Sequence, residues 1–146
     1  MRTEKINNEN KIMVIDLLKN VNGLNLENHI LDNCHLLLNE EEDIVGTISY
    51  EKYDNLAIVR YFVFKRNIEY KDLFILYESL EKELINKNIE NSLAIINSDE
   101  VKEVFSYLGF SKIEKDKVYF DETSFSNTSY KNNDVYLKKC INNYLY

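Results

Sequence analysis

Residues 63 to 88, VFKRNIEYKDLFILYESLEKELINKN, combine the end of an apolar strand, a charged turn and a long amphipathic helix. The start of such a helix offers backbone N–H groups without an intrahelical partner and a favourable dipole, and both features bind anions such as phosphate. Turns that hold phosphate usually contain glycine, because a residue without Cβ lets the backbone approach the anion closely. No glycine occurs between Gly46 and Gly109. The segment therefore predicts an anion site without the usual glycine, with cations at Lys65, Arg66 and Lys71.

Cysteine and histidine side chains offer two further kinds of chemistry. Cys34 and His35 are neighbours in the sequence, but adjacent residues of a strand point to opposite faces, so this spacing does not bring a nucleophile to its base. Cys34 and Cys140 form no CxxC motif, and we interpret both as free, partly buried thiols. His29 has no second ligand at metal spacing and is predicted to be a surface residue. No metal site is predicted.

The composition is that of a folded protein, since the 146 residues are 45% hydrophobic and 29% charged. This length predicts a single domain over residues 1–146. The formal net charge of -7 argues against nucleic acid and anionic lipid as partners. The stretch YLKK at 136–139 is interpreted as a solvated strand end and not as a basic patch. Because no apolar run has the length of a membrane span or of a signal peptide, we expect no membrane association and a cytoplasmic protein.

Hydrophobic spacing divides the first half of the chain into short strands and a helix. Residues 1–6 predict a strand, and apolar positions at helical spacing predict a helix over about 12–22 that ends at Gly23. Turn-prone residues then separate three apolar runs, which predict an antiparallel meander. These runs are 36–38, 44–50 and 56–64.

The clearest helix in the sequence runs from about Lys71 to Asn88. Its apolar stripe consists of Leu73, Leu76, Tyr77, Leu80 and Leu84. Glu78 and Glu81 are predicted on the opposite, polar side. The apolar stretch NSLAIINS follows, as expected for a buried strand that pairs in parallel after a helical crossover.

A second helix is predicted at DEVKEVFSYLGF, with Ser98 or Asp99 as its N-cap and Gly109 at its end. KIEKDKVYFDE then predicts a strand or hairpin arm, and VYLKKCI a final strand. The elements together predict an α/β fold with a mixed, mostly antiparallel sheet and helices on both faces.

This order of elements resembles the GCN5-related N-acetyltransferase (GNAT) superfamily over essentially the whole chain. DIVGTISYEKY is similar to the third strand of that family, with Gly46 after an apolar pair, and residues 63 to 88 are similar to its cofactor-binding strand, turn and helix. VKEVFSYLGF, which closes on Leu108, Gly109 and Phe110, is similar to the family's penultimate helix. The resemblance implies an acyl-CoA N-acyltransferase-like fold in which strands 4 and 5 are parallel and splayed.

The resemblance also implies acetyl-CoA as co-substrate and an amine as acceptor. The pantetheine arm would lie between the splayed strands and pair with the backbone of Phe62, Val63 and Phe64. The phosphates would meet the turn before and at the start of the helix. The residues implied there are Lys65, Arg66, Glu69, Tyr70, Lys71, Asp72 and Leu73.

Two departures from the family pattern concern this turn and the chemistry. The two small residues of the family's phosphate turn fall on Lys71 and Leu73, or on Glu69 and Lys71 after a slip of two residues. Many family members protonate the departing thiolate with a tyrosine four residues before the closing glycine, and that position here is Phe105.

Two residues are therefore carried forward as catalytic candidates. Tyr107 is the alternative acid, although two residues along a helix is about 200 degrees around its axis. Glu51, at the end of the third strand, is the nearest carboxylate for a general base, with a solvated strand end as the competing interpretation.

Three functions stay open after the sequence alone. The first is an acetyl-CoA-dependent N-acetyltransferase that works mainly by aligning an amine with the thioester. The second is a catalytically inactive GNAT-fold interaction or regulatory module that has lost CoA binding, and the third is a protein that binds another small ligand between the splayed strands. The aromatic C-terminal segment VYLKKCINNYLY fits either a strand of its own sheet or pairing with a second subunit in a homodimer.

Overall fold

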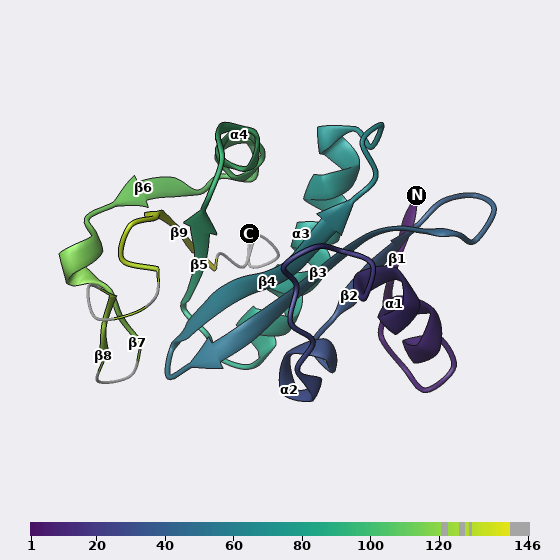
Figure 1. Cartoon of the computed structure of the whole chain (residues 1–146), viewed down its shortest axis with the longest axis horizontal. Coiled ribbons are helices and arrows are strands. Elements are labelled where there is room, and N and C mark those ends of the chain that lie inside the picture. Colours follow the sequence, from purple (N-terminus) through teal and green to yellow (C-terminus); the bar gives the residue numbers. More distant parts are fainter. Residues whose placement is uncertain (121–122, 126–127, 129, 141–146) are drawn as a thin grey trace. The chain divides into compact units, whose positions relative to one another are not determined.

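The computed structural model describes residues 1–120, 123–125, 128 and 130–140. The chain divides into two compact units, one with residues 1–51 and 60–80 and the other with residues 52–59 and 81–146. Figure 1 shows the labelled elements along the chain. The prediction of a single domain over 1–146 stays a prediction.

The first unit contains the N-terminal strands and two short helices. Strands β1 and β2 pair antiparallel, as do β2 and β3. Strand β4 from residue 60 onward and helix α3 up to residue 80 belong to this unit, and the remaining residues of both elements belong to the other unit. The bounds are β1 Arg2–Lys5, α1 Lys11–Leu18, α2 Asn28–Leu31, β2 His35–Leu38, β3 Ile44–Tyr53, β4 Leu56–Phe64 and α3 Tyr70–Asn86.

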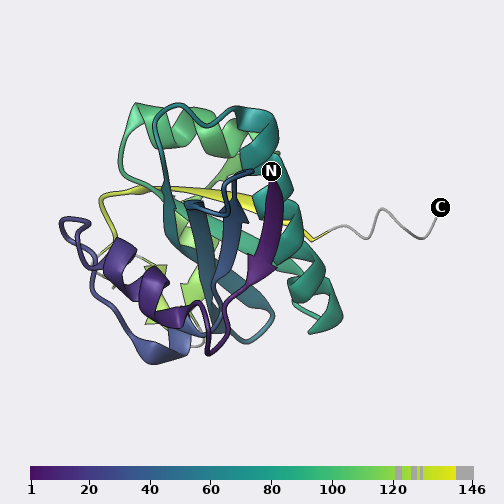
Figure 2. The same ribbon diagram turned by 90° about the vertical axis from the view of Figure 1, so that its right-hand side faces the viewer.

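The side-chain alternation of β2 gives the first unit two apolar layers. Leu36 and Leu38 belong to a buried cluster with residues of α1 and α2, among them Val14 and Leu31. Leu37 points to the other side, where it and Leu76 of α3 lie 3.5 Å from the position that a Cβ on Gly46 would occupy. Figure 2 shows α1 in purple and α3 in teal on opposite sides of these strands.

Helix α3 buries the stripe that its sequence predicts. Leu73, Leu76, Leu80 and Leu84 are completely buried, and Tyr77 is 1% exposed. The prediction for Glu81 is wrong, because this residue is also buried, at 6% exposure, and not part of a solvated polar face. Its charge is compensated by a residue more than fifty positions later in the sequence, as described below.

The second unit follows the crossover helix. Strand β5 pairs with β4 in parallel over Leu56 to Ile58, and antiparallel with β9. Strand β6 pairs with the other edge of β9, while β7 and β8 form a separate two-stranded sheet. The bounds are β5 Asn91–Ile96, α4 Asp99–Tyr107, β6 Ser111–Ile113, the 3-10 helix η1 Lys115–Lys117, β7 Tyr119–Phe120, β8 Thr123–Ser124 and β9 Asp134–Lys139.

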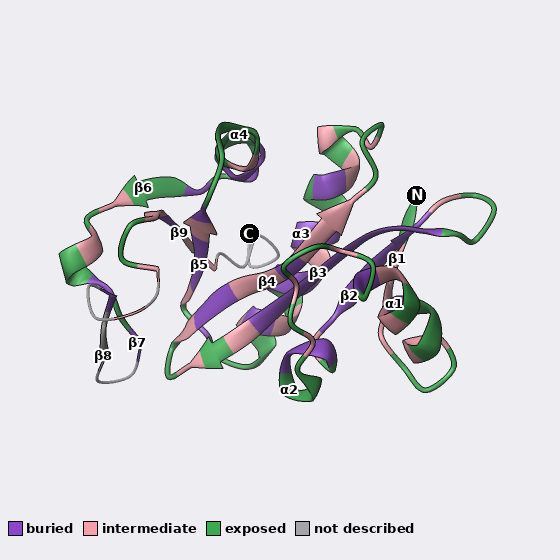
Figure 3. Ribbon diagram, viewed as in Figure 1, coloured by how far each residue is buried: buried purple, intermediate pink, exposed green. Residues whose placement is uncertain are grey.

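The strand order β1-β2-β3-β4-β5-β9-β6 confirms the predicted fold class. The sheet is mixed, and the β4–β5 pair is parallel among the antiparallel pairs given above. Figure 3 shows that buried residues follow β2 and β3, whereas the outer side of α1 is exposed. No helix in the described ranges is both long enough and apolar enough to cross a membrane.

Two predicted elements have different bounds in the structure. Helix α1 ends at Leu18 and not near Gly23, because the chain turns at once, with the amide of Val21 bonded to the carbonyl of Leu18. The segment KIEKDKVYFDE is not one continuous arm. The polar residues Lys115–Lys117 form a 3-10 turn that separates β6 from β7.

Candidate functional site

The turn between β4 and α3 is closed by its own backbone hydrogen bonds. The amide of Lys65 donates to the carbonyl of Val45, and the amide of Ile68 donates to the carbonyl of Lys65. At the start of α3, the amides of Asp72 and Leu73 both donate to the carbonyl of Glu69, at 3.0 and 3.2 Å. Because these four amides already donate to backbone carbonyl groups, fewer amides are left to bind a phosphate than the sequence predicts.

The cationic side chains of this turn lie in solvent. Lys65 and Arg66 are exposed, and Lys71 forms an ion pair with Glu69 at 3.3 Å. The side chains of Lys71 and Glu69 are 71% and 68% exposed, so this pair is weak and can open for a competing anion. The turn therefore offers exposed surface charge and not a preformed cradle for phosphate.

Tyr61 interrupts the extended backbone of β4 with a φ of 48 degrees. A bulky residue in the left-handed region costs free energy and persists only where its surroundings hold it. Here the hydroxyl group of Thr47 donates to the carbonyl oxygen of Tyr61 at 2.7 Å. The phenol is buried against the α1–α2 layer, and desolvation raises its pKa. The strand nevertheless continues past this residue to Phe64, and the amide of the next residue, Lys65, donates to the carbonyl of Val45 in β3.

The same tyrosine connects β4 to the segment that precedes α2. Its hydroxyl group donates to the carbonyl oxygen of Asn25 and accepts from the amide of Glu27, both at 2.8 Å. The position of α2, which begins at Asn28, is therefore coupled to the strained residue of β4.

A cluster of three ionisable side chains lies beside this connection, and we call Glu51, Arg60 and His29 the Glu51 cluster. Oε1 of Glu51 accepts from Nε and Nη2 of Arg60, at 3.2 and 2.9 Å. Oε2 of Glu51 lies 3.4 Å from Nε2 of His29. The side chain of Glu51 is only 16% exposed, whereas that of His29 is 63% exposed. The cluster thus holds a largely buried carboxylate behind an imidazole that solvent and ligands can reach.

The Glu51 cluster changes the interpretation of Glu51. The sequence presented this residue as a general base or a solvated strand end, but in the structure both carboxylate oxygens have basic partners. Such a carboxylate is better suited to orient His29 than to accept a proton directly, because its lone pairs are already used and its negative charge is compensated. The prediction that His29 lies on the surface agrees with its exposure.

A small cavity of about 100 Å³ lies on the β4 side of the first unit. Its lining comes from α1, the start of β3 and the end of β4 with the first residue of the turn. The lining residues are Leu17, Val45, Gly46, Val63, Phe64 and Lys65. Three of the predicted cofactor-binding residues, Val63, Phe64 and Lys65, therefore line one cavity.

The second unit contains the other catalytic candidate. Tyr107 lies on α4 and is 50% exposed, whereas Phe105 is 4% exposed and packs edge-on against Phe110 at a centroid distance of 5.0 Å. Since the two side chains are about 200 degrees apart around the helix axis, only one of them can face the core. The role of Tyr107 as a proton donor stays a prediction.

The second unit also contains an ion pair between a carboxylate and an amine, and both of its partners are largely buried. Nζ of Lys138 donates to Oε2 of Glu81 at 2.5 Å, with side-chain exposures of 16% and 8%. Lys138 belongs to the stretch YLKK, whose interpretation as a solvated strand end is wrong for this residue.

Burial, followed by the charge of Glu81, raises the pKa of the nearby Cys140 thiol to about 11. The thiol is therefore neutral and unreactive at neutral pH.

Comparisons with solved structures identify the fold. The structure is similar to a GNAT-family acetyltransferase from Staphylococcus aureus, with a TM-score of 0.69 and 16% identity over 96% of this chain and 99% of that chain. It is also similar to a Mycobacterium tuberculosis protein in complex with CoA, with a TM-score of 0.73 and 12% identity over 95% of this chain and 99% of that chain. No protein-family model and no curated protein sequence matches the chain.

A third similar structure is larger. It is N-acetylglutamate synthase from Neisseria gonorrhoeae complexed with CoA and N-acetyl-glutamate, at a TM-score of 0.73 and 12% identity. The match covers 96% of this chain but 35% of that protein. The protein therefore has the fold of the GNAT acetyltransferases, as the resemblance in the sequence implied, and it is a divergent example of that fold.

Proposed function

We propose that the protein is an N-acetyltransferase that transfers the acetyl group of acetyl-CoA to a small or peptidic amine. The observation that carries this proposal is that β4 pairs with β5 only over Leu56 to Ile58, so the backbone of Phe62 to Phe64 lies beyond that parallel ladder. The CoA complexes of similarly folded proteins support CoA as the ligand of this segment. The phosphates would meet the exposed cations Lys65, Arg66 and Lys71, together with the start of α3 at Tyr70 to Leu73.

The Glu51 cluster supplies a proton acceptor for this reaction. An amine must lose its ammonium proton before its lone pair attacks the thioester carbonyl. In the proposed step, that proton passes to the imidazole of His29. Glu51 orients this imidazole, and Arg60 holds Glu51 in place. The C–N bond then forms and the C–S bond breaks. The nitrogen releases its surplus proton to water, and the CoA thiolate takes a proton from water, or from Tyr107 that water then reprotonates, to leave as the thiol.

Binding of acetyl-CoA is the first test. Titration of acetyl-CoA into the purified chain by isothermal calorimetry should give saturable binding, and desulfo-CoA should compete. Absence of heat and of any thermal shift at millimolar acetyl-CoA would exclude the enzyme and favour the inactive module with the same fold. Release of free CoA in the presence of a panel of amines then measures transfer itself.

Two charge-reversal substitutions test where the phosphates of acetyl-CoA bind. Lys71→Glu should weaken acetyl-CoA binding about fivefold, as expected for the loss of one exposed ionic contact. Lys19→Glu is the matched control, because Lys19 is also exposed and paired with a neighbouring acid, Asp16, at 2.9 Å. Equal effects of the two substitutions would show that the phosphates bind elsewhere.

Some proposals rest on the sequence alone. The acceptor amine, the homodimer and the cytoplasmic setting stay predictions. The C-terminal segment proposed for the homodimer is described only as far as residue 140, and residues 141–146 lie outside the described part of the chain.

A further inference from the structure

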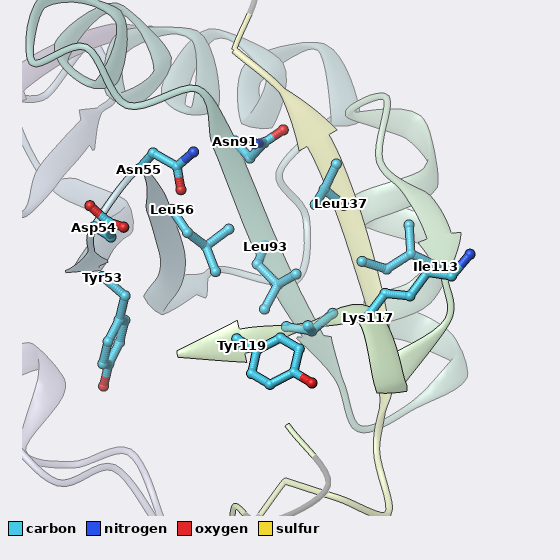
Figure 4. A pocket seen from close by; sticks show the side chains of 11 residues that line it. Tyr53, Asp54, Asn55, Leu56, Asn91, Leu93, Ile113, Lys117, Tyr119 and Leu137 are labelled. Carbon is cyan, nitrogen blue, oxygen red and sulfur yellow. The ribbon is translucent and has the colours of Figure 1, made fainter. Parts of the chain in front are cut away.

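A cavity of about 310 Å³ lies entirely within the second unit. Ligand-binding cavities begin at about this size and combine an apolar floor with a few polar groups. Figure 4 shows the leucine side chains in the middle of the lining, with Asp54 and Asn55 on one side and Ile113 and Lys117 on the other. The full lining is Tyr53, Asp54, Asn55, Leu56, Asn91, Leu93, Ile113, Lys117, Val118, Tyr119 and Leu137.

The leucine and isoleucine residues of this lining belong to one buried cluster or pack against it. Leu93 is buried and lies opposite Leu137 in the β5–β9 ladder. Leu56, Ile113 and Leu137 pack against the same buried cluster but are themselves only partly buried. Tyr119 is 55% exposed at the edge of the floor. A flat apolar ligand on this floor would remove exposed leucine and tyrosine surface from water.

The walls of the cavity are held in place without a ligand. The carbonyl oxygen of Asn55 accepts from the amides of Glu90 and Asn91, at 3.1 and 3.3 Å, which fixes the β3–β4 turn to the start of β5. The ring of Tyr53 packs on Phe120 at a centroid distance of 5.3 Å and so connects the same turn to β7. A ligand would therefore lose little free energy in ordering the site.

The charges at the rim favour a cation. Lys117 is paired with Glu114 at 3.4 Å, and Figure 4 shows its amine turned away from the leucines. Asp54 is exposed at the other side of the lining. Taken together, Asp54, Lys117 and Glu114 carry a net charge of about -1, in a chain whose formal net charge is -7.

We propose that this cavity binds a small organic amine with a flat apolar body. The ring or short chain lies on Leu56, Leu93 and Leu137 beside Tyr119, and the ammonium group faces Asp54. The proposal concerns binding by the second unit alone and stands whether or not the protein transfers an acetyl group.

Three ligands of equal shape and different charge test the proposal on the full chain. Phenethylamine, 2-phenylethanol and phenylacetate are titrated separately against the isotope-labelled protein and followed by amide chemical shifts. We expect the amine to bind about fivefold more tightly than the alcohol, as one exposed ionic contact allows, and phenylacetate to bind most weakly. The shifts should map to residues 53–56, 91–93 and 117–119.

Two variants separate the contribution of the Asp54 charge to binding from that of the apolar contact with Tyr119. Asp54→Asn should abolish the preference for phenethylamine over 2-phenylethanol, and it should fold, because Asp54 has a φ of 53 degrees, which asparagine adopts readily. Asp116→Asn, on the neighbouring 3-10 turn, is the matched control and should keep the preference. Tyr119→Ser should weaken both ligands alike.

Three results would overturn the proposal. They are equal binding of the amine and the alcohol by the unmodified protein, shifts that map outside the lining, and no binding of any of the three at millimolar concentration. The acetyl-CoA titration described above is independent of all of them, so failure of this site and failure of the proposed transferase are separate outcomes.

Discussion

The two units each contain a carboxylate paired with a basic side chain, but the pairs differ in exposure. In the first unit, Glu51 is paired with Arg60, and His29 lies exposed on its other oxygen. In the second unit, Glu81 and Lys138 contact each other at 2.5 Å with side-chain exposures of 8% and 16%.

This difference between the two pairs distinguishes an ionisable group that a ligand can reach from one that belongs to the core. A largely buried ion pair has no room for a ligand, and removal of one partner leaves an uncompensated charge. An exposed imidazole held by a largely buried carboxylate can still exchange a proton with a bound molecule. We therefore propose His29 of the Glu51 cluster as the candidate proton acceptor and assign a structural role to Glu81.

The largest effect is expected from breaking the buried pair. Glu81→Ala leaves the Lys138 ammonium group buried without its partner and should lower the free energy of unfolding by about 3–5 kcal/mol. Urea unfolding followed by circular dichroism measures the change.

Two further variants complete this comparison. The double substitution of Glu81 and Lys138 by methionine should recover most of the lost stability, since no buried charge remains. Glu51→Gln in the first unit should cost about 1–2 kcal/mol, because the glutamine oxygen can still accept from Arg60 and because the other partner, His29, is exposed and can be solvated. Equal losses for Glu81→Ala and Glu51→Gln would contradict the distinction between the two pairs.

The next effect concerns the rate of acetyl transfer, if the protein binds acetyl-CoA. His29→Ala should lower kcat about 100-fold and leave the affinity for acetyl-CoA unchanged, as loss of a general base does. Added imidazole should restore part of the rate, which a purely structural role would not allow. Asn28→Ala, on the same exposed turn of α2, is the control and should retain full activity. Full activity of His29→Ala would remove the Glu51 cluster from the mechanism.

The smallest effect uses the two thiols as reporters of the charges beside them. Burial raises the pKa of Cys34 and that of Cys140 to about 11, and the charge of Glu81 contributes only to Cys140. Loss of a nearby negative charge favours the thiolate, so Glu81→Gln should lower the pKa of Cys140 and leave that of Cys34 at about 11.

Alkylation by iodoacetamide across the pH range, resolved by peptide mass spectrometry, measures both thiols in one sample. A midpoint that shifts for both cysteines alike would indicate partial unfolding and not a local charge effect. In the unmodified protein, the raised pKa values have a further consequence for stability. The unfolded thiols ionise near pH 9 and the folded ones near 11, so stability is lost as the pH rises between these values.

Much of the fold could be predicted from the sequence because local spacing decides it. The stripe of α3 is buried as its helical period indicates. Ser98 caps α4 through its hydroxyl group, which accepts from the amide of Val101 at 3.2 Å, and Gly109 follows with a φ of 99 degrees. These features depend on residues within a few positions of one another, so a single sequence contains the necessary information.

The site was predicted less completely, because its parts are remote in sequence. His29, Glu51 and Arg60 come from three different elements, and no spacing in the sequence indicates that they meet. The left-handed backbone of Tyr61 also has no signal, since the chain carries tyrosine where glycine would have marked such a conformation.

The sequence by itself determined the order of elements, the parallel β4–β5 pair within a mixed sheet and the absence of glycine from the turn after β4. The tertiary structure alone decided which charges are buried. Glu81 and Glu51 are both acids beside apolar residues in the sequence, and only the strands packed around them make one a core ion pair and the other a support for an exposed histidine. The physical reason is that the free energy of a charge depends on its solvation, which is set by neighbours that distant parts of the chain supply.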